Sequence, residues 1–146
     1  MLTSCFLANT HVTNNNKRKM EDTRIMLEKF KKFIWDVSGV EQKAEDISNK
    51  MLDLILPHFH RYLEEDTDKM KKNGFIIIHE ARMMTIARIT QKVFKENGIT
   101  AHHKKFADYI GLKFEKKLID ELNKENIDVT NDASGSIKLV KKSSGD

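Results

Sequence analysis

Apolar side chains recur every three or four residues along most of the chain, which is the spacing of amphipathic helices. The first such stretch covers residues 21–37. Its apolar positions are Met26, Phe30, Phe33, Ile34 and Val37, with charged side chains between them. Acidic residues in its first turn suit the positive end of the helix dipole. We therefore expect a helix here that ends at Ser38-Gly39.

A second helical pattern follows at once and runs to Leu63. Ser38 and Glu41 have the spacing of a capping box, in which the two side chains bind backbone amides of the first turn. Pro57 falls inside the pattern. Because proline lacks an amide proton and its ring clashes with the preceding turn, the pattern predicts either a kink at Pro57 or a new helix that starts there.

Phe75 to Asn97 is the most apolar stretch of the chain, and its apolar residues cover more than one face of a helix. A helix that is apolar on several sides is contacted from several sides. We therefore predict a central helix over this whole stretch, ended by Gly98 in the left-handed conformation.

The order of elements from Ile99 to Lys142 gives the strongest indication of function. Thr100 is a suitable N-cap for a short helix over residues 101–109. Gly111 would then form a tight turn, with Leu112 buried beside it. A second helix is expected over residues 113–126, burying Phe114, Leu118 and Leu122.

Two short alternating stretches follow, Ile127–Val129 and Ser136–Lys142, with a polar turn over residues 131–135 between them. Helix, turn, helix and hairpin in this order resemble a winged helix-turn-helix domain. The resemblance covers about residues 99–142, with the helix 75–97 as the domain's first helix. It implies that the second helix of the pair enters the major groove of DNA.

The predicted fold is mainly α, with N-terminal helices packed on a C-terminal winged helix-turn-helix that carries a small β-hairpin wing. We expect a disordered basic arm over residues 1–19, a helical scaffold over 20–73, the winged-helix module over 74–142 and a tail over 143–146. The arm is explained either by an untrimmed or alternative start, since Met20 opens a helix-like stretch, or by contact with phosphates. We favour the former, because three adjacent basic residues are common in solvated tails.

If this docking applies, lysines would supply the nucleic-acid contacts. On the second helix the outward residues would include Lys113, Lys116 and Lys117, with Glu115 and Asp120 among them. Phosphate contacts are expected from the start of the first helix and from the wing. These residues are Lys104, Lys105, Lys138, Lys141 and Lys142.

Amino-acid composition excludes few classes of protein. The net charge of +4 is spread over the chain, so it is compatible with a nucleic-acid partner without requiring one. The single cysteine, Cys5, allows no disulfide within the chain, and no apolar run reaches the ~20 residues that span a bilayer. We expect an intracellular protein without a membrane anchor, in the cytoplasm or the nucleus.

No enzyme motif is present. The sequence has no glycine-rich phosphate loop, nucleophile elbow or CxxC pair. His79-Glu80 resembles the start of a zinc-protease helix, but the second histidine of that motif is replaced by Met83. We expect no metal and no cofactor.

The hypothesis from the sequence is a small non-enzymatic DNA-binding protein of the transcriptional-regulator type. The alternative is an interaction or assembly subunit whose winged helix grips a protein. In either case the N-terminal helices would offer a surface for a homodimer or another protein partner.

Overall fold

The computed structural model describes residues 20–29 and 39–142, and every structural statement below concerns these residues. The predicted arm, the end of the first predicted helix, Ser38 and the tail lie outside them. Residues 20–29 are helical. The other elements are α3 (Val40–Glu65), α4 (Thr67–Asn73), β1 (Phe75–Ile77), α5 (Glu80–Glu96), the 3-10 turn η1 (Ala101–His103), α6 (Lys104–Lys124), β2 (Ile127–Asn131) and β3 (Ile137–Lys141). The protein is therefore mostly helical, with a small antiparallel sheet at its C-terminal end, as predicted.

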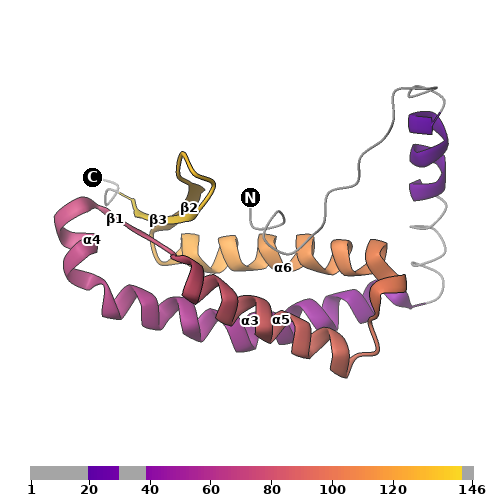
Figure 1. Ribbon diagram of the computed structural model, residues 1–146, viewed down its shortest axis with the longest axis horizontal. Helices are drawn as coiled ribbons and strands as arrows, with labels where there is room; N and C mark the ends of the chain where they lie inside the picture. Colours follow the sequence, from indigo (N-terminus) through magenta and orange to yellow (C-terminus); the bar gives the residue numbers. More distant parts are fainter. Residues whose placement is uncertain (1–19, 30–38, 143–146) are drawn as a thin grey trace.

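Helix α3 runs along the length of the molecule and is its main support (Figure 1). It buries one row of side chains: Ala44, Ile47, Ser48, Met51, Ile55, Phe59 and Tyr62. Pro57 lies within the unbroken helix, so no new helix starts there. Its exposed position lets water solvate the carbonyl that loses its amide partner. Gly39, in the left-handed conformation, stands at the N-cap, and no side chain caps this end.

The prediction of one helix over Phe75–Asn97 is wrong at its start. Residues Phe75–Ile77 form strand β1, and α5 begins only at Glu80. The strand pairs antiparallel with β3, opposite residues Lys138–Val140. Ile76 and Ile78 are buried while Ile77 between them is half-buried, which is the two-residue alternation of a strand. Consecutive isoleucines suit a pleated sheet because their branched Cβ atoms disfavour helix.

The predicted turn at Gly111 is also wrong. Helix α6 continues from Lys104 to Lys124 with Gly111 inside it, and Leu112 is 53% exposed instead of buried. The connection to the preceding helix lies earlier, over residues 97–103. There Gly98 has a φ of 70°, and the Thr100 hydroxyl accepts the amide proton of His102. The predicted cap at Thr100 is confirmed, although it caps η1.

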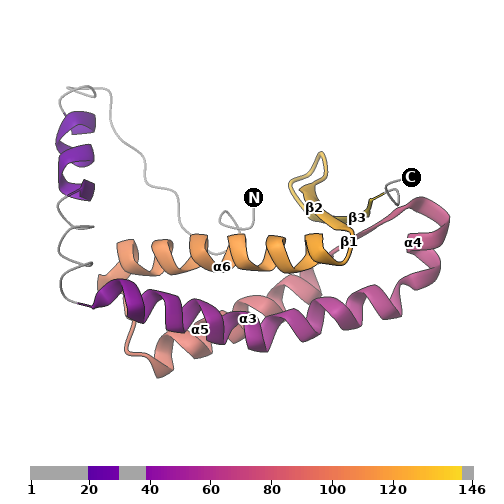
Figure 2. The same cartoon turned by 180° about the vertical axis from the view of Figure 1, so that it is seen from behind.

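The two predicted strands at the C-terminal end are confirmed as β2 and β3, and they form a β-hairpin at the position of the predicted wing; the name wing is kept below for this hairpin only. β3 lies in the middle of the sheet, between β1 and β2. Asp132 stabilises the turn by accepting amide protons from Ser134 and Ser136 at 3.0 and 2.8 Å. Figures 1 and 2 show the sheet at the end of the molecule where α6 stops. One hydrophobic cluster joins α3, α5, α6 and the sheet.

Candidate nucleic-acid interface

Two of the predicted DNA-contacting lysines, Lys113 and Lys117, face α3 instead of solvent. The ammonium of Lys113 lies 2.9 Å from Glu41 Oε1 and 3.1 Å from Glu45 Oε2, and Lys117 pairs with Glu45. Their side chains are only 21% and 24% exposed. Both charges are therefore matched within the molecule, at the contact between α6 and the first half of α3.

The pKa values of these groups reflect the pairing. Hydrogen bonds from Tyr109 and then Lys113 lower the pKa of Glu41, and hydrogen bonds from Lys117 and Lys113 lower that of Glu45. The pKa of Lys113 is raised, chiefly by its hydrogen bond to Glu41. Glu41 is held by α6 and does not reach back to cap its own helix. The cluster stays charged at neutral pH and holds α6 to α3.

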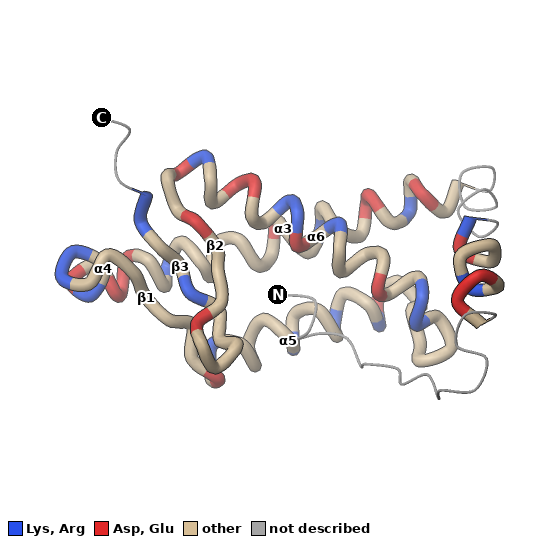
Figure 3. Tube along the Cα trace, turned by 90° about the horizontal axis from the view of Figure 1, so that it is seen from above, with Lys and Arg blue, Asp and Glu red and all other residues tan. Residues whose placement is uncertain are grey.

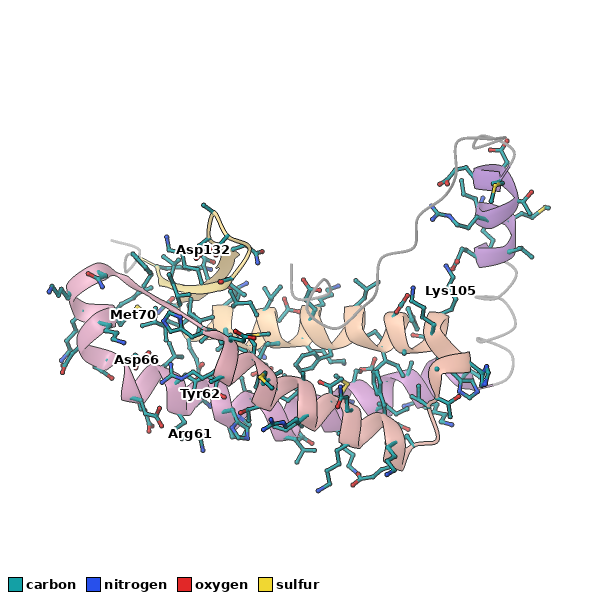
Figure 4. The ribbon with its side chains drawn as sticks, in the orientation of Figure 1. Arg61, Tyr62, Asp66, Met70, Lys105 and Asp132 are labelled. Carbon is teal, nitrogen blue, oxygen red and sulfur yellow. The ribbon has the colours of Figure 1, made fainter. Side chains whose placement is uncertain are left out.

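The remaining predicted lysines are dispersed over the molecule. Lys116 is exposed on α6, and Lys105 pairs with Glu28 of the helical segment 20–29 at 3.0 Å. Lys104, beside it, is half-buried. Figure 4 shows Lys105 at the end of α6 that is far from Asp132 in the wing. With 1.5 Å rise per residue, the length of α6 separates these two ends by about 30 Å.

The wing lysines are partly engaged as well. The ammonium of Lys138 lies 4.1 Å from the centroid of the Phe75 ring, a cation–π contact. Lys142 lies 3.3 Å from Asp128 Oδ1. Lys141 is exposed, and its amide proton binds the carbonyl of Gly74 at 3.0 Å. The structure therefore does not bring the eight predicted lysines onto one surface.

Helix α5 carries cations that the sequence hypothesis did not single out. Its outward side presents Ala81, Met84, Arg88, Gln91, Lys92 and Lys95, all exposed. In the part of the chain that the structure describes, Arg88, Gln91, Lys92 and Lys95 have no side-chain ion pair or hydrogen bond. We call these four residues the α5 stripe. The signal was in the sequence, because no Asp or Glu occurs between residues 81 and 95.

Arg82, on another side of the same helix, is paired with carboxylates of the chain, unlike the cations of the α5 stripe. Its guanidinium donates to Asp66 Oδ2 at 2.8 Å and to Glu65 Oε2 at 2.9 Å, and it stacks 4.4 Å from the centroid of the Tyr62 ring. The hydrogen bond from Arg82 lowers the pKa of Asp66. This cluster fixes the start of α5 against the end of α3. Figure 4 shows Tyr62 and Asp66 at this end of α3.

A groove of about 670 Å³ lies beside the stripe, between the end of α5 and the start of α6. Gln91 and Lys95 line one wall and Lys104 lines the α6 side. Asp108 also lines it, and its Oδ1 atom is buried without a hydrogen-bond partner among the described residues. The groove is therefore lined by both acidic and basic side chains, whereas the α5 stripe contains no carboxylate.

Three of the described histidines, His58, His60 and His103, make separate local contacts. His58 bonds to Arg61, His60 to Glu125, and His103 to the amide of Thr100. Among residues 20–29 and 39–142, no group of three or more His, Cys, Asp or Glu side chains is placed to hold a metal ion. None of the described helices is long and apolar enough to cross a membrane. Cys5 lies outside the described residues.

Comparison with known proteins assigns the chain to no family. No protein-family model, curated protein or solved structure matches the chain.

Proposed function

We propose that the chain is a small, non-enzymatic DNA-binding protein built on a winged-helix arrangement. The observation that carries the proposal is the order of its elements. From α4 to β3 the order is helix, strand, helix, helix, strand and strand, apart from the single 3-10 turn η1 before α6, and the last strand lies in the middle of the sheet. This is the order of elements in a winged helix, with α5 and α6 as the helix pair and β2–β3 as the wing.

The helix pair differs from the one expected from the sequence. The sequence hypothesis placed both helices within residues 101–126, which α6 and η1 occupy almost alone. We assign the helix pair instead to α5 and α6, which are joined by a connection that contains Gly98 and the Thr100 cap. A fold alone does not specify a function, so the charges at the surface have to support the same partner.

The distribution of unmatched cations supports a polyanionic partner. Lys141 on the wing and the cations of the α5 stripe are exposed. Neutralising phosphates releases condensed counterions, which is the main source of affinity in sequence-independent DNA binding. With Lys113 and Lys117 matched to glutamates, we expect contact with the DNA backbone to contribute more than reading of bases by α6.

The test is binding of the purified full-length chain to a labelled DNA duplex, measured by fluorescence anisotropy between 50 and 300 mM salt. We expect affinity that falls steeply as salt rises, with a slope in the double-logarithmic plot of about −0.9 for each phosphate neutralised. Absence of binding at the lowest salt concentration would overturn the proposal.

A second candidate function is an interaction or assembly subunit, which the helical segment 20–29 favours. Met20 and Leu27, seven residues apart, lie on the same side of this helix, and Met26 is 66% exposed. Such a side is suited to pair with a helix of another chain.

A homodimer formed through this segment would appear as twice the monomer mass in size-exclusion chromatography with light scattering. The double substitution Met26→Asp, Leu27→Asp should return it to a monomer, and a wild-type protein that stays monomeric at high concentration would exclude this dimer.

A further inference from the structure

The outward side of α5 differs in charge from every other helix surface that the structure describes. Each of the helices 20–29, α3, α4 and α6 mixes exposed acidic and basic residues along its length. On α5 the exposed carboxylates, Glu80 and Glu96, lie at its two ends, and the α5 stripe between them contains only Arg88, Gln91, Lys92 and Lys95. We propose that the α5 stripe, and not α6, is the surface that contacts the phosphates of double-stranded DNA. This inference rests on the proposed DNA binding and specifies where it takes place.

The spacing of the stripe fits a helix surface that meets a DNA strand. Arg88, Lys92 and Lys95 are separated by four and three residues, so they lie on one side of α5. Arg88 and Lys95 are seven positions apart, so they are separated by about 10 Å along the helix axis. If α5 lies parallel to the axis of the duplex, one strand advances past about three phosphates over that length, since its phosphates rise about 3.4 Å per nucleotide along the axis. Three cations therefore match the charge density of one strand.

The side chains of the stripe are also free to bind. The opposite side of α5 holds it to the core through Ile86, Thr90 and Val93, so the stripe points away from α3 and the sheet. Figure 3 shows α5 along one side of the molecule, separate from α6. Binding of DNA there would require no rearrangement of the core and no break of an ion pair among the described residues.

The competing surface on α6 is less suitable. Its outward residues include Lys116 and Lys124, but Asp120 is exposed between them and Lys124 pairs with Glu121 at 2.9 Å. Each carboxylate that faces a phosphate opposes binding. Arg88 and Gln91 add planar groups that can each form two hydrogen bonds to one base edge, arginine to guanine and glutamine to adenine. We therefore expect α5 to contribute most of the affinity and a weak dependence on sequence.

The experiment compares two variants with the same change in net charge in the full-length chain. The first replaces the stripe cations, Arg88→Ala, Lys92→Ala and Lys95→Ala. The second, a control, replaces three exposed lysines of α4, Lys69→Ala, Lys71→Ala and Lys72→Ala, which follow a run of acidic residues. Alanine favours helix and all six side chains are exposed, so both variants should keep the wild-type circular dichroism spectrum and melting temperature.

The expected result is that the α5 variant binds a DNA duplex at least about tenfold more weakly at 0.1 M salt. Its salt slope should be smaller by about three, because three phosphate contacts are lost. The α4 variant should lose less than about threefold in affinity and should keep its slope. Equal losses in the two variants, or an unaffected α5 variant, would overturn the assignment of the surface while DNA binding itself stands. A wild-type protein that binds no duplex would instead overturn the proposed function together with this inference.

Discussion

Helices α5 and α6 are both rich in cations, but the acids opposite them give these cations different roles. On α6, Lys113 and Lys117 meet Glu41 and Glu45 of α3 and become part of the interface between the two helices. On α5, Arg82 is the only cation with such a partner among the described residues, and the other cations belong to the exposed α5 stripe. A cationic side chain on a helix can bind an anion of another molecule only where no carboxylate of the same chain is already paired with it.

Paired and unpaired cations should also contribute to different properties of the protein, the paired ones to its stability and the unpaired ones to DNA binding. Cations that are matched within the fold should affect the free energy of unfolding when they are removed, whereas those of the α5 stripe should affect only binding. The predictions below test this separation, beginning with the residue for which we expect the largest effect.

Arg82→Ala should lower the free energy of unfolding by about 2–3 kcal/mol. The change leaves Asp66, whose side chain is only 14% exposed, without its charged donor and removes the stacking on Tyr62. Chemical denaturation measures the loss. Arg88→Ala, six residues further along α5, is the matched control and should change stability by less than about 0.5 kcal/mol. Equal losses in the two variants would contradict the distinction between matched and unmatched cations.

Lys113→Ala should destabilise the protein by about 1–2 kcal/mol and leave its affinity for a DNA duplex nearly unchanged. The loss is smaller than for Arg82 because Glu41 and Glu45 are about one-third exposed and water replaces part of the interaction. Lys116→Ala, on the exposed side of the same helix, serves as the stability control. A Lys113→Ala protein with wild-type stability and much weaker DNA binding would restore the original prediction that Lys113 contacts DNA.

Gly111→Ala should stabilise the protein by about 1 kcal/mol. Gly111 lies inside α6, a Cβ atom added there would meet nothing within 4 Å, and alanine favours helix over glycine by about that amount.

Gly98→Ala should destabilise the protein by about 1 kcal/mol, because the φ of 70° at Gly98 is unfavourable for any residue with a Cβ atom. Thermal unfolding of both variants tests where the connection between α5 and α6 lies. A loss of stability in Gly111→Ala would favour the turn that the sequence suggested.

The elements that the sequence predicted well are those whose pattern is local. The second helix, the hairpin at the C-terminal end and the cap at Thr100 each depend on residues within a few positions of one another. Their boundaries follow from helical periodicity, from strand alternation and from a polar turn.

The errors arose where a distant segment decides the structure. A run of isoleucines fits a buried helix or a strand equally well, and β3, far along the chain, provides the partner that makes it a strand. Gly111 looked like a turn residue, but packing of Phe114, Leu118 and Leu122 extends the helix through it. The direction of Lys113 depends on glutamates 68 or more residues away, which no local pattern includes.

The smallest effect we expect is a loss of stability in acid, and its source again lies in the matched groups. Glu41, Glu45 and Asp66 have lowered pKa values in the folded protein, so below about pH 4.5 the unfolded chain binds more protons than the folded one. Their contribution is complete above that pH and is lost as the pH falls through the folded-state values. Denaturation midpoints between pH 3 and 7 should show this decline, and it should be shallower in Arg82→Ala and Lys113→Ala. In the α5 variant the decline should match the wild type, because the stripe stabilises no carboxylate; a shallower one would show that its cations are matched after all.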